Sequence, residues 1–313
     1  MKILLLGGGG YVGTPLTEKL LENKRNKITV VDTFWFGNFL KKNKRLKVIK
    51  KDIRNVKIEW FKGIDSVIHL ANIANDPAVD LNPNLSWDVN VVTSIKIIKF
   101  ATKCKVKKFI YASSGSVYGV KKEKNVTEDL DLVPISIYNK TKMVAERVFM
   151  SFKDKIHIYC IRPATVCGIS PRMRYDVSVN LLTLQAIKKK KITVLGGNQT
   201  RPNIHIKDMI RLYEFFLKRK IPSGFYNAGF ENLKINKIAK MIQKKTNAKI
   251  NVIKSNDPRS YRQDSTKITK LGFKTMYGVR HAIEDLIDLD RTKKIKVNQS
   301  NYTVKWMKKL KIQ

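Results

Sequence analysis

Residues 2–32, KILLLGGGGYVGTPLTEKLLENKRNKITVVD, decide the fold class. The apolar start predicts a buried strand, the segment from Tyr11 predicts a helix with one apolar stripe, and the closing KITVVD predicts a second strand. Gly7, Gly10 and Gly13 join the first strand to the helix. Glycine adopts the positive φ that a tight turn needs, and a helix that begins after such a turn offers free N–H groups to phosphate. The stretch therefore predicts a loop that binds a pyrophosphate.

The end of the second strand predicts which dinucleotide this loop would hold. Asp32 follows Gly13 by 19 residues, a spacing typical of dinucleotide sites. Its carboxylate would accept hydrogen bonds from both adenosine ribose hydroxyls and would repel a 2′-phosphate, which favours NAD over NADP. Asp52 follows the next expected strand and would contact the adenine, unless it is a solvated loop residue. Trp35 and Phe36 would form an adenine-side wall or simply pack the loop.

Strand and helix patterns alternate through the first half of the chain. Strands separated by helices favour right-handed βαβ units, and strands that are apolar throughout favour a parallel sheet covered on both faces. The sequence therefore predicts an α/β fold with a doubly wound, parallel Rossmann-type sheet. Further strands are expected at 46–52, 66–71, 108–113 and around Tyr159 up to Pro163, with helices at 85–104 and 135–152.

The pattern becomes less regular after residue 165, and the tail from Lys293 carries no clear periodicity. We expect an NAD-binding Rossmann domain over 1–165 with a return segment near 200–220. A smaller C-terminal α/β substrate-binding region is expected over 166–199 and 221–313. Its helices are predicted at 177–190, 234–245 and 279–290, its strands at 192–197 and 249–254, and the helix of the return segment at 208–219.

A tyrosine and a lysine share one face of the helix predicted at 135–152. Tyr138 and Lys142 stand four residues apart in YNKTK, a spacing that alone means little. The spacing becomes informative together with Ser114, which lies in YASSGSVYG at the end of the strand predicted at 108–113. Ligands of open parallel sheets bind beyond the carboxyl ends of the strands, so Ser114 is expected at the ligand site. A nearby ammonium and a cationic nicotinamide would lower the pKa of the tyrosine. Tyr138 could then take a hydroxyl proton while hydride leaves the same carbon, with Ser114 holding the reacting oxygen.

These motifs together resemble a known family. GGGGYVG, VVD, KDIR, HLAN, SSGSVYG and YNKTK, in this order, are similar to the extended short-chain dehydrogenase/reductases, and among them to the NAD-dependent nucleotide-sugar epimerase/dehydratase group. The resemblance covers about residues 1–290. It implies a catalytic role for Ser114, Tyr138 and Lys142, and a supporting role for Asn90. The cofactor contacts that we expect are Gly7, Gly10, Tyr11, Val12, Gly13, Asp32, Asp52, Ile53, Ala71, Tyr138 and Lys142.

The same resemblance implies a substrate site made by the second half of the chain. Asn180, Arg201 and Arg259, together with Ser114, would contact the sugar nucleotide and its diphosphate. His205 could touch the substrate or serve a structural role. Arg172 and Arg174, in SPRMRYD, would belong either to a solvated loop or to a phosphate clamp.

Two departures from the family pattern narrow the reaction. Related dehydratases carry acidic residues after the catalytic serine or threonine, where this chain has Gly115 and Ser116. Loss of water from C5–C6 would lack its proton carrier, which argues against a 4,6-dehydratase. The stretch TVCG, with Thr165 and Cys167, also differs from the common NVYG.

The sequence therefore predicts NAD-dependent oxidoreduction at C4 of a nucleotide-activated sugar through a 4-keto species. A 4-epimerase is favoured by its frequency in the family, but a 4-dehydrogenase or a 4-ketoreductase would need the same three catalytic residues. A more distant alternative is a protein that only binds NAD or RNA on a dehydrogenase scaffold, since fold does not determine function.

The net charge is the unusual feature of the composition. The 313 residues include 63 basic and 25 acidic ones, giving +38, and only 14 of the basic residues are arginine. A dedicated nucleic-acid surface would more often show arginine and local clustering, whereas here the lysines are spread along the chain. We therefore expect no nucleic-acid partner.

Composition also bounds the compartment and the assembly. No apolar stretch is long enough for a membrane helix or a signal-peptide core. Cys104, Cys160 and Cys167 lack the spacing of a disulfide framework or a zinc site, so we expect a cytoplasmic protein without a metal. His69 is expected to be a packed core residue. The family resemblance further implies a homodimer that pairs the helices at 85–104 and 135–152.

Overall fold

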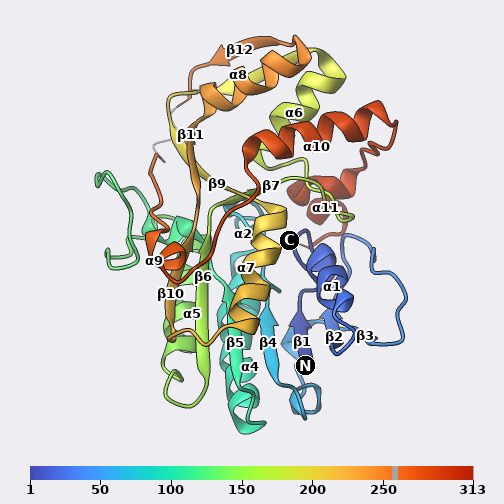
Figure 1. Ribbon diagram of the computed structural model, residues 1–313, viewed down its shortest axis with the longest axis vertical. Helices are drawn as coiled ribbons and strands as arrows, with labels where there is room; N and C mark the ends of the chain where they lie inside the picture. Colours follow the sequence, from blue (N-terminus) through green and yellow to red (C-terminus); the bar gives the residue numbers. More distant parts are fainter. Residues whose placement is uncertain (256–259, 313) are drawn as a thin grey trace.

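A seven-stranded parallel sheet forms the centre of the computed structural model, which describes residues 1–255 and 260–312 (Figure 1). The strand order is β10-β6-β5-β4-β1-β2-β3, and every neighbouring pair is parallel. This confirms the predicted α/β Rossmann-type sheet. The strands are β1 (Lys2–Leu6), β2 (Lys27–Asp32), β3 (Leu46–Lys50), β4 (Ser66–His69), β5 (Lys108–Ala112), β6 (His157–Pro163) and β10 (Gly224–Ala228).

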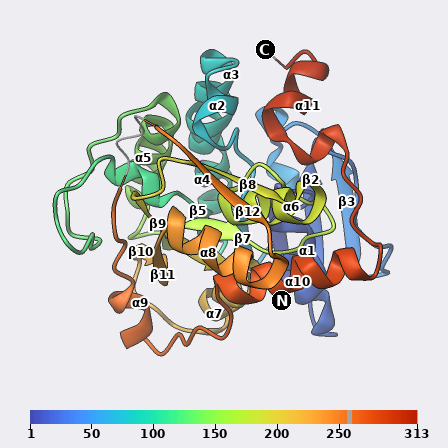
Figure 2. The same ribbon diagram turned by 90° about the horizontal axis from the view of Figure 1, so that it is seen from above.

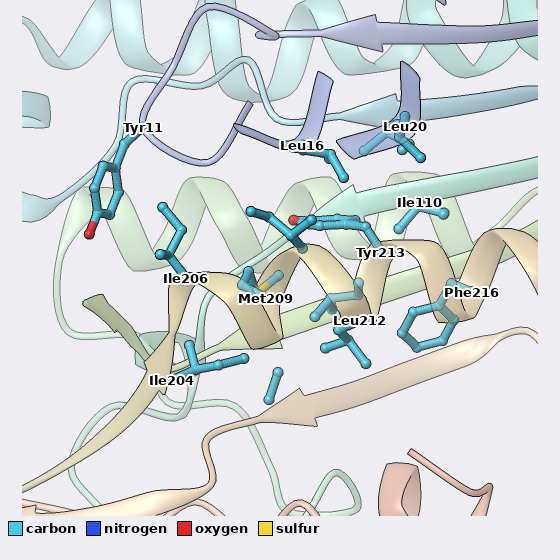
Figure 3. Close-up of a cluster of buried hydrophobic side chains, with 14 of the residues drawn as sticks. Tyr11, Leu16, Leu20, Ile110, Ile204, Ile206, Met209, Leu212, Tyr213 and Phe216 are labelled. Carbon is cyan, nitrogen blue, oxygen red and sulfur yellow. The ribbon is translucent and has the colours of Figure 1, made fainter. Parts of the chain in front are cut away.

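Helices cover both faces of the sheet, which is why its strands are apolar throughout. Side chains along a strand alternate between the two faces, so Ile3 and Leu5 enter one core while Leu4 and Leu6 enter the other. Figure 3 shows the first core, where Met209, Leu212, Tyr213 and Phe216 pack near Leu16 and Leu20. This core is built by α1 (Gly13–Glu22) and α7 (Ile206–Lys218), and the second one by α4 (Thr93–Lys103) and α5 (Ile137–Met150).

The direction in which successive strands are added to the sheet reverses between β1 and β4. From β1 the chain adds β2 and β3 on one side, then returns to add β4, β5 and β6 on the other. Loops that leave the carboxyl ends of adjacent strands in opposite directions open a crevice there, where α/β proteins bind their ligands. The glycine loop after β1 and the residues after β4 and β5 meet at this edge.

A smaller region lies above the carboxyl edge of the sheet in Figure 1, and Figure 2 looks down onto it. One of its sheets has the order β11-β9-β7 and the other pairs β12 with β8. Its strands are β7 (Thr165–Cys167), β8 (Lys191–Leu195), β9 (Thr200–His205), β11 (Glu231–Lys234) and β12 (Lys249–Ile253). Its helices α6 (Ser178–Lys189), α8 (Ile235–Thr246) and α10 (Val279–Arg291) share a third core. Short helices complete the chain as α2 (Asp76–Val79), α3 (Pro83–Trp87), α9 (Thr266–Lys270) and α11 (Thr303–Lys309).

Three elements differ from the sequence expectation. The helix expected at 85–104 is divided into α3, the π-helical turn η3 (Asp88–Val92) and α4. Strand β10 joins the large sheet although it lies within 221–313, the range expected for the substrate-binding region. In the tail after Lys293, α11 returns to the NAD-binding half, where Met307 enters the core beneath α4 and α5. Among the helices of the described residues, none has the length and apolar character needed to cross a bilayer.

Candidate active site

The glycine loop is shaped by two close backbone contacts. Gly7 has a φ of +85°, and a Cβ added to it would lie 2.4 Å from the Ala71 nitrogen. A Cβ on Gly13 would lie 2.3 Å from the Gly7 carbonyl oxygen. At Gly10 the nearest atom would be 3.4 Å away, and this residue lines the adjoining cavities. The loop therefore leads directly into the N-terminus of α1. There the Thr14 N–H already donates to the Gly10 carbonyl and Pro15 has no N–H, so a pyrophosphate would be met by the loop residues that come before Thr14.

Asp32 is held rigidly at the end of β2. Its Oδ2 accepts the Gly9 N–H at 2.8 Å, and its Oδ1 accepts the Phe34 N–H at 2.7 Å. Burial raises the pKa of this carboxyl, while the two N–H groups and the charge of Arg172 lower it. Each oxygen retains a further lone pair, so the carboxylate can still accept ribose hydroxyls.

A cavity of about 140 Å³ adjoins Asp32 and is lined by several of the residues expected at the adenine. Trp35 and Phe36 line it and also pack on the core beneath. The packing is thus observed, and the contact of these rings with an adenine stays a prediction. Asp52 lines it too, although its carboxylate is paired with Arg54 at 2.9 Å. The remaining expected contacts in this lining are Gly7, Gly10, Ile53 and Ala71.

Arg172 is buried in a neighbouring cavity of about 240 Å³. Its guanidinium lies 3.9 Å from the centre of the Phe36 ring, and its Nε has no hydrogen-bond partner among the described residues. Burial lowers the pKa of Arg172 to about 9. Gly10, Tyr11, Val12 and Gly13 line the same space. A buried, incompletely paired cation beside a phosphate-type loop fits a bound anion, so the solvated-loop interpretation of Arg172 is wrong.

Ser114, Tyr138 and Lys142 converge at the carboxyl end of β5. Ser114 and Tyr138 line a cavity of about 480 Å³ that meets the Arg172 cavity at Tyr11 and Arg174. Lys142 donates to the Ala112 carbonyl at 2.7 Å, and its Nζ lies 5.8 Å from the centre of the Tyr138 ring. The structure thus brings the three predicted catalytic residues together.

Burial acts in opposite directions on the two titratable members of this group. It raises the pKa of Tyr138 to about 12, against which a hydrogen bond with Ser114 acts. It lowers the pKa of Lys142 to about 7, while the carboxylate of Glu146 raises it. Both shifts disfavour the charged forms, so a bound cation or anion in this cavity would change the protonation of both groups.

Asn90 connects the loop after β4 with the helix that carries Tyr138. Its Oδ1 accepts the Ile73 N–H at 2.9 Å, and its Nδ2 donates to the Thr141 hydroxyl at 3.1 Å. Thr141 in turn donates to the Tyr138 carbonyl at 2.8 Å. Asn90 lies within the π-helical turn η3, a feature frequent at functional sites. It is placed to support the site rather than to line it.

The residues expected at the substrate occupy different places. Asn180 is fully buried, where its Oδ1 accepts the Gly168 N–H at 2.9 Å and its Nδ2 donates to the Tyr11 hydroxyl at 3.0 Å. It therefore lies behind the cavity wall and joins two loops. Arg201 lines the cavity itself, and Arg259 lies outside the described residues.

Arg174 lines the cavity of Ser114 and Tyr138, and its expected role in a phosphate clamp stays a prediction. Its Nε donates to Asp176 at 2.8 Å. The two arginines of SPRMRYD thus serve adjacent cavities, and neither is fully exposed to solvent.

Two histidines have structural positions. His205 is buried and caps α7, its Nδ1 accepting the Lys207 N–H at 3.1 Å. His69 is packed among Phe109, Tyr111 and Phe149, as expected, and burial lowers its pKa to about 3. Over residues 1–255 and 260–312, no group of three or more His, Cys, Asp or Glu side chains is arranged to hold a metal ion.

The comparison with known families agrees with this geometry. The NAD dependent epimerase/dehydratase family matches residues 3–229 of the chain. A UDP-glucose 4-epimerase from Lactobacillus helveticus is 29% identical over 312 residues, covering 88% of this chain and 92% of the relative. A UDP-glucuronic acid decarboxylase 6 from Arabidopsis thaliana is 29% identical over 224 residues, covering 67% of this chain and 64% of the relative.

A solved structure gives the same result for the whole fold. The UDP-glucuronic acid 4-epimerase from Bacillus cereus, in complex with UDP-glucuronic acid and NAD, superposes with a TM-score of 0.84 at 29% identity. The match covers 94% of this chain and 100% of that structure. The similarity therefore extends beyond the sheet to the smaller region.

Proposed function

The chain belongs to the NAD dependent epimerase/dehydratase family, and from this premise we propose that it is a nucleotide-sugar 4-epimerase. The observation that carries the proposal is that Ser114 and Tyr138 line a cavity that adjoins the glycine loop, with Lys142 held beside them at the Ala112 carbonyl. A pure binding protein has no need of all three groups in one place.

The residues of the glycine loop and its surroundings fit NAD. The open face of Gly10 and the backbone N–H groups that come before Thr14 would receive the pyrophosphate, and the buried guanidinium of Arg172 would pair with it. Asp32 would hold the adenosine ribose, and the cavity beside Asp52 and Ile53 would take the adenine. When bound, the cofactor supplies the hydride acceptor and a positive charge near Tyr138.

The chain's own residues would then act on the C4 hydroxyl. Tyr138 would remove the proton of this hydroxyl. Its phenol is hydrogen-bonded to Ser114, and a nearby cation favours the phenolate form. Ser114 would donate a hydrogen bond to the reacting oxygen. Lys142 would hold the nicotinamide ribose and stabilise the charge on Tyr138. If the 4-keto sugar rotates in the site, and the hydride and the proton then return from the opposite face of C4, the product is the C4 epimer.

The cation Arg201 would face the diphosphate of the nucleotide sugar. Asn180 would hold the cavity wall rather than the substrate. A 4-dehydrogenase or a 4-ketoreductase would use the same residues, so the net reaction has to be measured.

The test is a product analysis. The purified protein is incubated with NAD and separately with UDP-glucose, UDP-galactose, UDP-N-acetylglucosamine and UDP-glucuronic acid, and each product is analysed by mass spectrometry and NMR. An epimerase leaves the mass unchanged and inverts C4. A loss of two hydrogens, of water or of carbon dioxide would instead identify a dehydrogenase, a dehydratase or a decarboxylase. Tyr138→Phe is the control that should remove any of these activities.

We further propose that the protein works as a cytoplasmic homodimer. The thiols of Cys104, Cys160 and Cys167 are free in the structure, which suits a reducing compartment. Exposed apolar residues at the start of α4 support pairing of α4 and α5 with a second copy.

A further inference from the structure

Two charged residues alternate with two core residues along the loop between β7 and α6. Met173 and Tyr175 are buried in the first core. Arg174 and Asp176 instead line the cavity of about 480 Å³ that holds the catalytic residues. Arg174 also lines the neighbouring cavity of about 240 Å³, so it lies where the two cavities meet.

Arg174 is fixed at both its backbone and its side chain. Asn180 Nδ2 donates to the Arg174 carbonyl at 2.9 Å, and Arg174 Nε donates to Asp176 Oδ1 at 2.8 Å. The Arg174 side chain is only 17% exposed. Over residues 1–255 and 260–312, its two terminal NH2 groups have no hydrogen-bond partner. These groups are therefore left to bind an oxyanion, whose oxygens they match in geometry.

Asp176 is in turn fixed by the C-terminal tail, residues 298–309. Its Oδ2 accepts the N–H of Thr303, the first residue of α11, at 2.9 Å. Beside this bond, the Tyr175 N–H donates to the Asn301 carbonyl at 3.0 Å, and Asn301 Nδ2 donates to the Met173 carbonyl at 3.2 Å. The carboxylate thus uses one oxygen for the tail and the other for its arginine neighbour.

The two bonds of Asp176 require an ionised acid. Burial acts to raise the pKa of Asp176, but the charge and hydrogen bond of Arg174, together with the Thr303 N–H, hold it below its usual value. A carboxylate offers an acceptor oxygen to each of the two donors, whereas an amide would turn an NH2 group towards one of them. Asparagine at this position could therefore keep only one of the two bonds.

We propose that Asp176 is a positioning residue that fixes the guanidinium of Arg174 for an oxyanion of the nucleotide sugar, and that the C-terminal tail holds Asp176 in place. An arginine already held in its bound geometry loses less conformational freedom when the ligand binds, so the affinity is higher. Asp176 acts through Arg174 and needs no contact with the ligand. This inference rests on the proposed function, because it concerns the substrate of the same site.

The test is a double-mutant cycle on ligand affinity. UDP-glucose and UDP-glucuronic acid are titrated calorimetrically into NAD-loaded Tyr138→Phe protein, in which turnover does not disturb the signal. Asp176→Asn should weaken binding by about fivefold, and Arg174→Ala by about tenfold or more. In the presence of Arg174→Ala, Asp176→Asn should change the affinity by less than about twofold, because no guanidinium remains to be positioned.

The matched control is Asp288→Asn on α10. It breaks an exposed pair with Arg291 and lies outside the linings of both cavities. This variant should bind both UDP-sugars as its parent does.

A further variant tests the part played by the tail. Thr303→Pro removes the N–H that Asp176 accepts, at the first position of a helix, where proline is favoured. It leaves both charged side chains in place and should weaken binding of the UDP-sugars by about threefold. Unchanged affinity would show that the tail does not hold Asp176 for binding.

The outcomes of the cycle separate the inference from the proposed function. Coupling between Asp176 and Arg174 with both UDP-sugars assigns the diphosphate as the bound oxyanion, and coupling with UDP-glucuronic acid alone assigns the sugar carboxylate. Equal losses with and without Arg174, or tighter binding by Asp176→Asn, would overturn the positioning role. Coupling in a protein whose wild type turns over no nucleotide sugar would overturn the proposed function alone, and failure of the parent to bind either UDP-sugar would overturn both.

Discussion

The ammonium group of Lys142 lies in a buried environment that disfavours its charged form. The side chain is 3% exposed, and its Nζ has the Ala112 carbonyl as its hydrogen-bond acceptor. Burial therefore lowers the pKa of this lysine to about 7, far below its ordinary value. The unfolded chain binds a proton at this position up to about pH 10.5, whereas the folded chain loses it near pH 7. Between these values the unfolded state holds more protons, so folding becomes more favourable as pH rises.

We predict that Lys142→Met removes this pH dependence in the cofactor-free protein. The penalty of the buried ammonium is fully present below pH 7 and is relieved above it, so the variant should gain most relative to wild type at pH 6. The difference in free energy of unfolding between the two proteins should shrink by about 2 kcal/mol between pH 6 and pH 9. Urea denaturation at both pH values measures it. A difference that does not change with pH would show that Lys142 keeps its ordinary pKa.

Substitutions of the three catalytic residues should differ in whether they affect turnover, NAD binding or both. We predict that Tyr138→Phe lowers turnover by roughly 10²- to 10⁴-fold with nearly unchanged NAD affinity, because only the proton carrier is removed. Lys142→Ala should weaken both turnover and NAD binding, and Ser114→Ala should be mildest, since water can replace one hydrogen bond. Steady-state kinetics and NAD titration of the three variants test this order. Near-full turnover by Tyr138→Phe would require another base.

The spacing of residues along the sequence predicts the positions of some site residues but not of others. Tyr138 and Lys142 can be predicted to lie together because a helix places residues four apart on one face. The position of Arg172 cannot be predicted in this way, because it enters the site from an irregular loop whose path depends on contacts far away in the chain. Asn180 is a different case, since the family resemblance names the residue but only the structure shows that it is buried and bonded to Gly168 and Tyr11.

Helix α5 is attached to the sheet by a buried ion pair. Arg162 on β6 donates through Nε and Nη2 to both carboxylate oxygens of Glu146 on α5, at 2.9 and 2.8 Å. Arg162 also donates to the Tyr118 hydroxyl at 2.8 Å and lies 4.4 Å from the centre of the Phe225 ring. Breaking one side of such a pair leaves the other charge buried without a counterion.

We predict that Glu146→Gln lowers the free energy of unfolding by roughly 3–5 kcal/mol, because the charge of Arg162 is then uncompensated. Urea denaturation of the variant measures the loss. The double variant Glu146→Leu/Arg162→Met serves as the control, and it should be more stable than Glu146→Gln because no charge remains buried. A loss below about 1 kcal/mol for Glu146→Gln would mean that the surroundings of Arg162 already neutralise it.

Helix α11 is hydrogen-bonded to two loops, one that contains Trp35 and one that contains Asp176. The Trp306 indole donates to the Trp35 carbonyl at 2.6 Å, and the Thr303 N–H is bound by Asp176. Thr303 and Met307 line the cavity that contains Arg172. This helix thus forms part of the wall around the proposed pyrophosphate site.

We predict that Trp306→Phe weakens NAD binding by about fivefold, the scale of one lost hydrogen bond, because the Trp35 wall of the cavity loses its anchor. Isothermal titration with NAD measures the change. Lys305→Ala, at an exposed position on the same helix, is the matched control and should bind NAD as the wild type does. Equal affinity in Trp306→Phe would separate α11 from the cofactor site.

Periodicity predicts elements where the core is regular. The expected strands at residues 2–6 and 27–32 coincide with β1 and β2, since each is an apolar run between two covered faces. The sequence of β10, GFYNA, has no such run, and only its pairing with β6 makes it a strand of the large sheet. The turn η3 is equally hard to predict, because a single π-helical turn of five residues is too short to set a period of its own.

The whole molecule combines a strong positive charge with a partly apolar helical face. Helices α4 and α5 lie in contact on one side of the sheet. Val92 and Ile95, at the start of α4, are 49% and 37% exposed. Lys96 and Lys99 continue the same surface. Pairing two copies through these helices would cover the apolar side chains but would also bring like charges together, within a chain whose net charge is +38.

We therefore predict a homodimer whose association strengthens as ionic strength rises. Apolar burial at α4 and α5 does not depend on salt in this range, whereas the repulsion between two strongly basic copies is screened once the Debye length falls from about 14 Å to about 6 Å. Multi-angle light scattering at micromolar protein in about 0.05 M and about 0.3 M NaCl measures the mass of the particle. Val92→Lys should shift the equilibrium towards monomer at both salt concentrations, while Lys240→Ala, at an exposed position on α8 of the smaller region, should not. A wild-type monomer in both buffers would rule out the dimer, and a dimer that dissociates as salt is added would show that ion pairs rather than apolar contacts hold it.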